Sequence, residues 1–202
     1  MAAKGRPAGH IFAAVDVHYP AEGGARAAAV LAADPSFAHV LAELTATVPQ
    51  VPPYRQGEFY LRELPPLRAV LRDVADLRLL VVDGYVDLDA LGRPGMGAHA
   101  HGAFGVPVIG VAKTAFPTAT HALQVLRGKS TRPLFITAAG VPVDEAADLV
   151  RNMAGRFRIP DVMRRADALA RTGVPLRPQG SLPEPRRYLP GSDPRPLTTA
   201  GS

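Results

Sequence analysis

The sequence predicts an α/β fold, in which a mixed sheet of an antiparallel meander plus parallel strands is flanked by helices. Two observations carry this prediction. Three apolar segments come first, separated by turn signals, and strand-like apolar runs then alternate with amphipathic stretches. With 202 residues, of which 47% are hydrophobic, the chain can bury one sizeable core. We therefore expect one domain over residues 1–173, followed by a tail.

The meander is predicted over residues 11–19, 25–33 and 38–48. The turn signals PAEGG and DPSF separate these apolar segments. The third segment also has the character of a short helix, so its type stays open.

Helices and strands alternate in the next part of the chain. Residues 64–74 have apolar positions at helical spacing, with Pro65 in the first turn of the predicted helix. The run LRLLVVDG follows and is typical of a strand that is buried on both faces. The glycine-rich GRPGMGAHAHGAFG predicts a loop that leads into a short helix of small residues.

Two further strands and two helices complete the predicted domain. The strands are VPVIGVAK and PLFITAAGVPV, and the first helix is DEAADLVRNMAGRF, with acids early and bases late. The last helix is IPDVMRRADALARTG, closed by Gly173 and Pro175. Residues 174–202 are rich in Pro, Gly and Arg and have little to bury, which predicts a flexible tail.

Composition narrows the chemistry that is available. The chain has no cysteine, which excludes disulfides, thiolate metal sites and a cysteine nucleophile. Lys and Arg outnumber Asp and Glu by 23 to 18, and the sequence pI is about 10.0. This balance suits a nucleic-acid partner, or it is an Arg-rich composition without meaning for partners. No apolar run approaches the length of a membrane span or a signal peptide, so we expect a soluble, cytoplasmic monomer.

Two carboxylates stand where a metal site would need them. Asp16 lies between Val15 and Val17 in a predicted strand, where a carboxylate is costly unless it is paired or binds a metal. Asp83 ends a buried strand, and ligand groups in α/β sheets gather beyond such ends. A surface ion pair for Asp16 and an Asp-Gly turn for Asp83 are the alternatives. Oxygen ligands would favour Mg²⁺ or Mn²⁺.

Four motifs in this order carry a family resemblance. They are A-A-V-D-V-H-Y at 13–19, Y-R-Q-G-E-F-Y-L-R-E at 54–63, D-G at 83–84 with V-I-G-V-A-K at 108–113, and G-R-F-R-I-P-D-V-M-R-R-A-D at 155–167. In sequence and spacing they resemble the motifs of the endonuclease V family, ribonuclease H-like nucleases that act on deaminated purines in DNA or RNA. The resemblance spans about residues 12–172.

The resemblance implies a Mg²⁺-dependent endonuclease, with Mn²⁺ as a possible substitute. It implies that Asp16, Glu63 and Asp83 are the metal ligands, and that Asp167 completes or supports the site. Lys113 would place positive charge near the scissile phosphate or orient the attacking water. The alternative for Lys113 is a solvated lysine at the end of a strand.

The resemblance also implies substrate-binding residues. Tyr54 matches a tyrosine that wedges into the nucleic acid, and its alternative is to pack the loop onto the core. Gly57 and Arg62 belong to the same motif. Gly84 would allow close approach of a flipped base, or it serves only the turn.

Some segments depart from the family pattern. The family usually has Q-G-x-x-H-P-R-R after the Asp-Gly, whereas this chain has YVDLDALGRP at 85–94. Its S-P-G-H stretch is replaced by TAAG at 137–140. We also expect no counterpart of the helix that commonly precedes the first strand in the family. For His99 and His101 we expect packing or polar support rather than metal ligation. For the arginines at 151–171, phosphate contact and a solvated helical face both remain open.

The implied reaction is hydrolysis of a phosphodiester on the 3′ side of a deaminated base such as inosine, leaving a 3′-hydroxyl and a 5′-phosphate. Two alternatives come from other classes. One is a nucleic-acid-binding protein that keeps the fold but does not cleave. The other is a small-molecule α/β enzyme, which is disfavoured because no Gly-rich phosphate loop opens a helix after the first strand.

Overall fold

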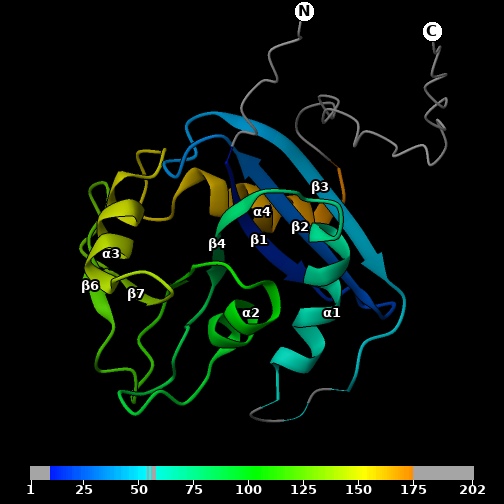
Figure 1. Cartoon of the computed structure of the whole chain (residues 1–202), viewed down its shortest axis with the longest axis horizontal. Helices are drawn as coiled ribbons and strands as arrows, with labels where there is room; N and C mark the ends of the chain where they lie inside the picture. Colours follow the sequence, from blue (N-terminus) through cyan, green and yellow to red (C-terminus); the bar gives the residue numbers. More distant parts are fainter. Residues whose placement is uncertain (1–9, 54, 56–57, 175–202) are drawn as a thin grey trace, which may run out of the picture.

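A seven-stranded mixed sheet forms the centre of the computed structural model, with strand order β3-β2-β1-β4-β5-β7-β6 (Figure 1). The structure describes residues 10–53, 55 and 58–174. The strands are β1 (Ile11–His18), β2 (Ala25–Ala32), β3 (Val40–Val48), β4 (Leu77–Asp83), β5 (Val108–Ala112), β6 (Leu123–Val125) and β7 (Leu134–Ala139). The predictions for Tyr54, Gly57 and residues 175–202 lie outside the described residues.

The first three strands form the predicted antiparallel meander, and the third segment is a strand rather than a helix. Five of the seven buried positions of β2 are alanines, including Ala27, Ala28 and Ala29. Small side chains on this strand let helices on both faces approach the sheet closely.

The parallel part of the sheet is the β1-β4-β5 unit. β4 pairs in parallel with β1 and with β5, whereas β5 and β7 are antiparallel. The carboxyl ends of β1, β4 and β5 therefore meet at one edge of the sheet. Groups that follow these strands are brought together there.

Two pairs of helices cover opposite faces of the sheet. The core around Leu67 and Val70 of α1 (Tyr60–Leu71) and Ala100 of α2 (Met96–Phe104) packs against one face. The core around Val150 of α3 (Val143–Asn152) and Ala166 of α4 (Asp161–Thr172) packs against the other. Figure 1 shows α4 passing behind β1 and β2.

The main differences from the sequence prediction concern two helices and one short strand. α1 begins at Tyr60, so Pro65 lies in its second turn and Glu63 in its first. Tyr60 stacks on His99 at 3.5 Å between ring centroids, a contact between helices that no local pattern reveals. α3 ends at Asn152, because the backbone turns before Gly155, whose φ is 107°. β6, of three residues, was not predicted.

The last helix ends as predicted. Gly173 adopts a left-handed conformation with φ 70° and donates its N–H to the carbonyl of Leu169. Across the described residues, no helix is long and apolar enough to cross a membrane.

Candidate active site

Asp16 and Asp83 lie beside each other at the carboxyl ends of β1 and β4. Val15 pairs with Val82 in the parallel register, so the two aspartates that follow them are neighbours. Ala14 packs into the core under α3 and α4. Because side chains alternate along a strand, Asp16 points to the same face as Ala14, toward α4.

Glu63 reaches the same place from α1. Together with Asp16, Asp83 and the apolar side chains of Leu67 and Val82, it lines a cavity of about 10 Å³. A cavity of this size has roughly the room for one water molecule. The strand ends and the first turn of α1 therefore enclose a small space between three carboxylates.

The electrostatics of Asp16 disfavour its charged form. Burial raises the pKa of Asp16 to about 6, against a lowering by the backbone N–H of Val17, which donates to Oδ1 at 2.9 Å. The charges of Asp83 and Asp167 raise this pKa further, and Lys113 lowers it.

The charged form of Glu63 is disfavoured more strongly than the charged form of Asp16. Burial is the largest cause and raises its pKa to about 8, and the negative charges of Asp16 and Asp83 add to the rise. The guanidinium of Arg62 opposes the rise. For both carboxyl groups, burial and the neighbouring negative charges outweigh the positive charges of Lys113 and Arg62. An added cation would offset the remaining repulsion.

Lys113 follows β5 and binds one member of this group. Its Nζ donates to Oδ2 of Asp83 at 2.5 Å, and the two side chains are 36% and 32% exposed. The Lys113 side chain is thus paired with Asp83 and still partly exposed to solvent. The ammonium therefore lies at the carboxylate edge of the candidate site.

The donor set fits a hard divalent cation. Carboxylate oxygens are the ligands that Mg²⁺ prefers, usually with water and phosphate as the remaining ligands. Within the described part of the chain, no three His, Asp or Glu side chains are already arranged as a metal-binding group. Lys113 is bonded to Asp83, and Glu63 comes from the helix layer rather than from the sheet. We therefore expect these side chains to rearrange when a cation binds.

Asp167 stands at the margin of the site. It accepts a hydrogen bond from Nε of Arg171 at 3.0 Å, one helical turn further on, and its side chain is 38% exposed. Its charge also contributes to the raised pKa of Asp16. Asp167 thus forms an ion pair with Arg171 and is also close enough to Asp16 to influence its pKa.

Arg62 and Tyr19 form a contact that the sequence interpretation missed. The Arg62 guanidinium lies 4.3 Å from the centre of the Tyr19 ring, and Phe59 packs on the same ring at 6.3 Å. Burial is the main cause that raises the pKa of Tyr19, and the charge of Glu63 adds to it. Tyr19 follows Asp16 by three residues, and this position within the first motif was the available signal.

Gly84 turns the chain immediately after Asp83. Its φ of 127° favours glycine, and a side chain at the neighbouring Gly110 would collide with the Gly84 carbonyl at 2.7 Å.

Thr137 lies in the segment that departs from the family pattern. It is buried, and its hydroxyl accepts the backbone N–H of Val86 at 2.7 Å, so it anchors the loop that follows Asp83.

The divergent loop at 85–94 is ordered by its own side chains. Asp89 accepts hydrogen bonds from Arg93 Nε at 3.1 Å and from the backbone N–H groups of Leu91 and Arg93. The two histidines of α2 have different partners: His99 stacks on Tyr60, and His101 Nδ1 bonds the Val106 carbonyl at 2.7 Å.

Comparison with known proteins places this chain in a family. Residues 2–130 match the family model "Endonuclease V". An endonuclease V of Azotobacter vinelandii is 33% identical over 184 residues, covering 79% of this chain and 81% of the relative. The chain belongs to the endonuclease V family. It is therefore a member of a family of nucleases, enzymes that hydrolyse phosphodiester bonds.

Solved structures agree on the ribonuclease H-like fold. The endonuclease V of Streptomyces avermitilis superposes with a TM-score of 0.68 at 28% identity, covering 83% of both chains. The endonuclease V of Ciona intestinalis, solved with a DNA containing an inosine followed by a ribo-adenosine, has a TM-score of 0.68 at 19% identity and covers 81% of this chain and 85% of that one.

Proposed function

We propose that this endonuclease V is a Mg²⁺-dependent enzyme that hydrolyses a phosphodiester on the 3′ side of inosine in DNA or RNA, leaving a 3′-hydroxyl and a 5′-phosphate. One observation carries the metal dependence: three carboxylates converge on one cavity, and the pKa values of Asp16 and Glu63 are raised. The inosine-containing DNA of the Ciona relative supports the substrate class.

In this proposal Asp16, Glu63 and Asp83 hold the cation, and Mn²⁺ can substitute for Mg²⁺. A bound divalent cation supplies a water that is nucleophilic at neutral pH and offsets the charge that develops on the phosphate. The carboxyl group of Glu63 gives up its proton before it can serve as a ligand, because its pKa is about 8 without a cation. Metal binding and proton release are therefore linked.

In this proposal Lys113 and Asp167 support the three metal ligands. The Lys113 ammonium, held at the Asp83 carboxylate, provides positive charge beside the phosphate that enters the site. Asp167, on α4, completes the negative surroundings of Asp16. The contact with Arg62 fixes the Tyr19 ring under the first turn of α1, which carries Glu63.

Substrate contacts are proposed for Gly84 and for the motif that holds Tyr54, Gly57 and Arg62. The φ of Gly84 leaves open space where a side chain would stand, so the backbone can approach a base there. Arg62 is committed to the Tyr19 ring in this structure, and this supports a positioning role beside its substrate role.

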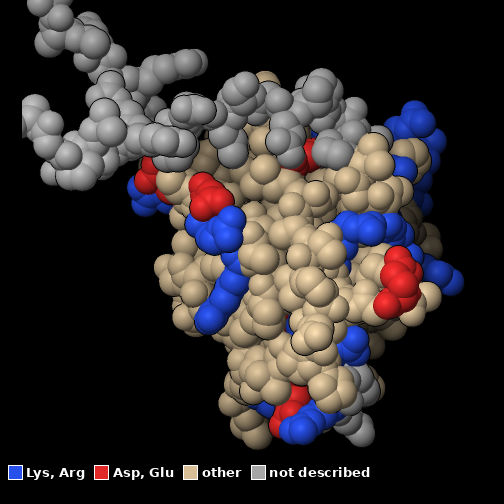
Figure 2. Space-filling view, turned by 90° about the vertical axis from the view of Figure 1, so that its right-hand side faces the viewer, with Lys and Arg blue, Asp and Glu red and all other residues tan. Residues whose placement is uncertain are grey.

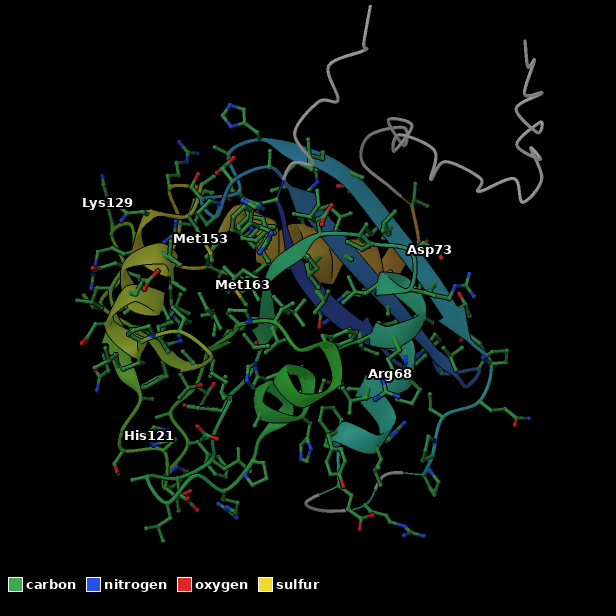
Figure 3. The ribbon with its side chains drawn as sticks, in the orientation of Figure 1. Arg68, Asp73, His121, Lys129, Met153 and Met163 are labelled. Carbon is green, nitrogen blue, oxygen red and sulfur yellow. The ribbon has the colours of Figure 1, made fainter. Side chains whose placement is uncertain are left out.

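The test is cleavage of inosine-containing DNA and RNA oligonucleotides with Mg²⁺ or Mn²⁺. We expect a product with a 3′-hydroxyl and a 5′-phosphate from the wild type and none from Asp83→Asn. The matched control is Asp73→Asn, because Asp73 is an exposed aspartate next to Arg72 on the surface of the protein (Figure 3). Binding of the inosine strand without any cleavage would favour the non-cleaving alternative.

A further inference from the structure

A second cavity lies between the loop that joins β6 to β7 and the loop that joins α3 to α4. Its volume is about 740 Å³. The charged side chains that line it are all basic: Lys129, Arg156, Arg158 and Arg164. An acid close by, Asp161, lies 3.5 Å from Arg164 and offsets part of that one charge. We call this cavity the basic pocket.

The walls of the basic pocket are held in place from below by a buried arginine. Arg127 is 5% exposed, and its guanidinium donates to backbone carbonyls at the end of α3 and in the α3–α4 loop. The acceptors are Arg151, Met153, Gly155, Phe157 and Arg158. These hydrogen bonds hold the backbone on both sides of Phe157, which lines the basic pocket.

An aromatic ring stands among the basic side chains. Phe157 is 49% exposed, although it is a large apolar residue. The guanidinium carbons of Arg156 and Arg164 each lie 5.0 Å from the centre of its ring. Aromatic rings and guanidinium planes are the surfaces on which unpaired bases stack, and basic side chains hold the phosphates.

The basic pocket is connected to the candidate active site. Arg158 lines it and also lines a neighbouring cavity of about 340 Å³, which Lys113 and Arg132 line as well. The guanidinium of Arg158 donates to the backbone carbonyl of Lys113, whose ammonium binds Asp83. Lys113 and Arg158 thus link the carboxylates of the candidate site to the basic pocket through direct contacts.

One other face of the described part of the chain differs from the basic pocket (Figure 2). On the face drawn in Figure 2, the described basic side chains are scattered around a broad uncharged area, and several lie next to acids. Lys129 and Arg68 lie on opposite sides of the molecule (Figure 3), so Arg68 serves as a basic control that is remote from the pocket.

We propose that the basic pocket is a second nucleic-acid subsite, which binds a single-stranded nucleotide of the substrate outside the cleavage point. Its basic side chains hold the phosphates, and a base stacks on Phe157 and the guanidinium planes beside it. The link to cleavage rests on the proposed function, whereas binding of the strand does not. The pocket would thus select substrates in which the strand next to the lesion is unpaired.

Binding is measured first, with a fluorescent single-stranded oligonucleotide without inosine, in EDTA, by fluorescence anisotropy. Phe157→Ala is expected to weaken binding by about 5- to 100-fold, the range for loss of one stacked base. Phe157→Leu keeps the apolar bulk but removes the ring and should weaken binding as well. Thermal melting of both variants checks that they are folded.

The salt dependence tests the charges. Combining Lys129→Gln with Arg156→Gln should reduce the slope of log Kd against log salt by about 1.4, since each phosphate contact on a single strand contributes about 0.7. Arg68→Gln should leave the slope unchanged. Equal effects at Arg68 and in the pocket, or unchanged binding by folded Phe157 variants, would overturn the proposal.

Cleavage then locates the subsite on the substrate. The wild type should cleave an inosine substrate that has long single-stranded flanks with a higher kcat/KM than a substrate whose flanks are shortened on both sides of the inosine. Phe157→Ala should lose this preference and keep its rate on the short substrate. If the wild type cut neither, the proposed function would fail, while the binding measurement would still decide on the pocket. An unaltered length preference in Phe157→Ala would overturn the subsite.

Discussion

Glu43 and Glu63 are two carboxylates in the interior of the protein with opposite electrostatic surroundings. Glu43, on β3, is 2% exposed and forms an ion pair with Nε of Arg165 on α4. Glu63, on α1, faces the negative charges of Asp16 and Asp83, and its pKa is raised to about 8. The first carboxylate meets its cation within the fold. The second lies in a group with excess negative charge, which a cation from solution would offset.

The first prediction removes the charge of Glu63. Glu63→Gln keeps the shape of the side chain but removes a ligand, and we expect cleavage to fall by about three orders of magnitude, since a metal site supplies several kcal/mol of transition-state stabilisation. The free energy of unfolding in EDTA should stay the same or rise, because repulsion with Asp16 is relieved. Single-turnover cleavage and urea unfolding measure the two effects. Cleavage close to the wild-type rate would remove Glu63 from the site.

The second prediction removes the charge of Glu43. Glu43→Gln leaves the Arg165 guanidinium without this carboxylate, and breaking such a buried pair costs about 3–5 kcal/mol of unfolding free energy. Urea unfolding checks the loss. Cleavage by the folded fraction should change little. The double variant Glu43→Leu, Arg165→Met should regain much of the stability, since it removes both charges; if it were as unstable as the single variant, the loss would come from packing.

The third prediction concerns pH. The folded-state pKa values of Asp16 and Glu63, about 6 and about 8, exceed the ordinary values of 3.8 and 4.5, so the folded protein binds more protons than the unfolded chain between about pH 4 and pH 8. Stability in EDTA is therefore highest below this window and falls as pH rises through it. We expect the melting temperature to fall by about a few degrees from these two groups.

Glu63→Gln is the control for the pH effect, because it removes the group with the higher pKa. In this variant the melting temperature in EDTA should fall less steeply at the upper end of the pH window. Saturating Mg²⁺ should raise the melting temperature more at pH 8 than at pH 5, because ligand carboxylates must be ionised. An equal Mg²⁺ effect at both pH values would contradict binding at these carboxylates.

Much of the fold could be predicted, because its signals are local. Apolar runs bounded by turn signals located six of the seven strands, and Gly173 marked the end of α4. The start of α1 could not be predicted. Its first turn carries Tyr60, which stacks on His99, a residue far away in the chain, and no local pattern marks this contact. β6 has three residues, too few for a periodic pattern.

The candidate site divides in the same way. The motifs pointed to Asp16, Glu63, Asp83 and Lys113, which the structure brings together. The roles of Tyr19 and Arg127 were missed, because each depends on contacts made across the fold. For Arg127 no sequence signal was available, since the carbonyls that it binds belong to a loop whose shape the sequence does not specify.

The last prediction separates the two roles of Asp167, its ion pair with Arg171 and its negative charge near Asp16. Asp167→Asn and Arg171→Gln both remove the helical ion pair, and each should cost about 0.3–0.5 kcal/mol of unfolding free energy. Only Asp167→Asn also removes negative charge near Asp16, so it alone should lower the pKa of Asp16 and move the acidic limb of the cleavage profile to lower pH. We expect its rate at neutral pH to fall about tenfold, equivalent to about 1.4 kcal/mol. Identical pH profiles for the two variants would reduce Asp167 to its pairing with Arg171, and the carboxylates of the site would then number three.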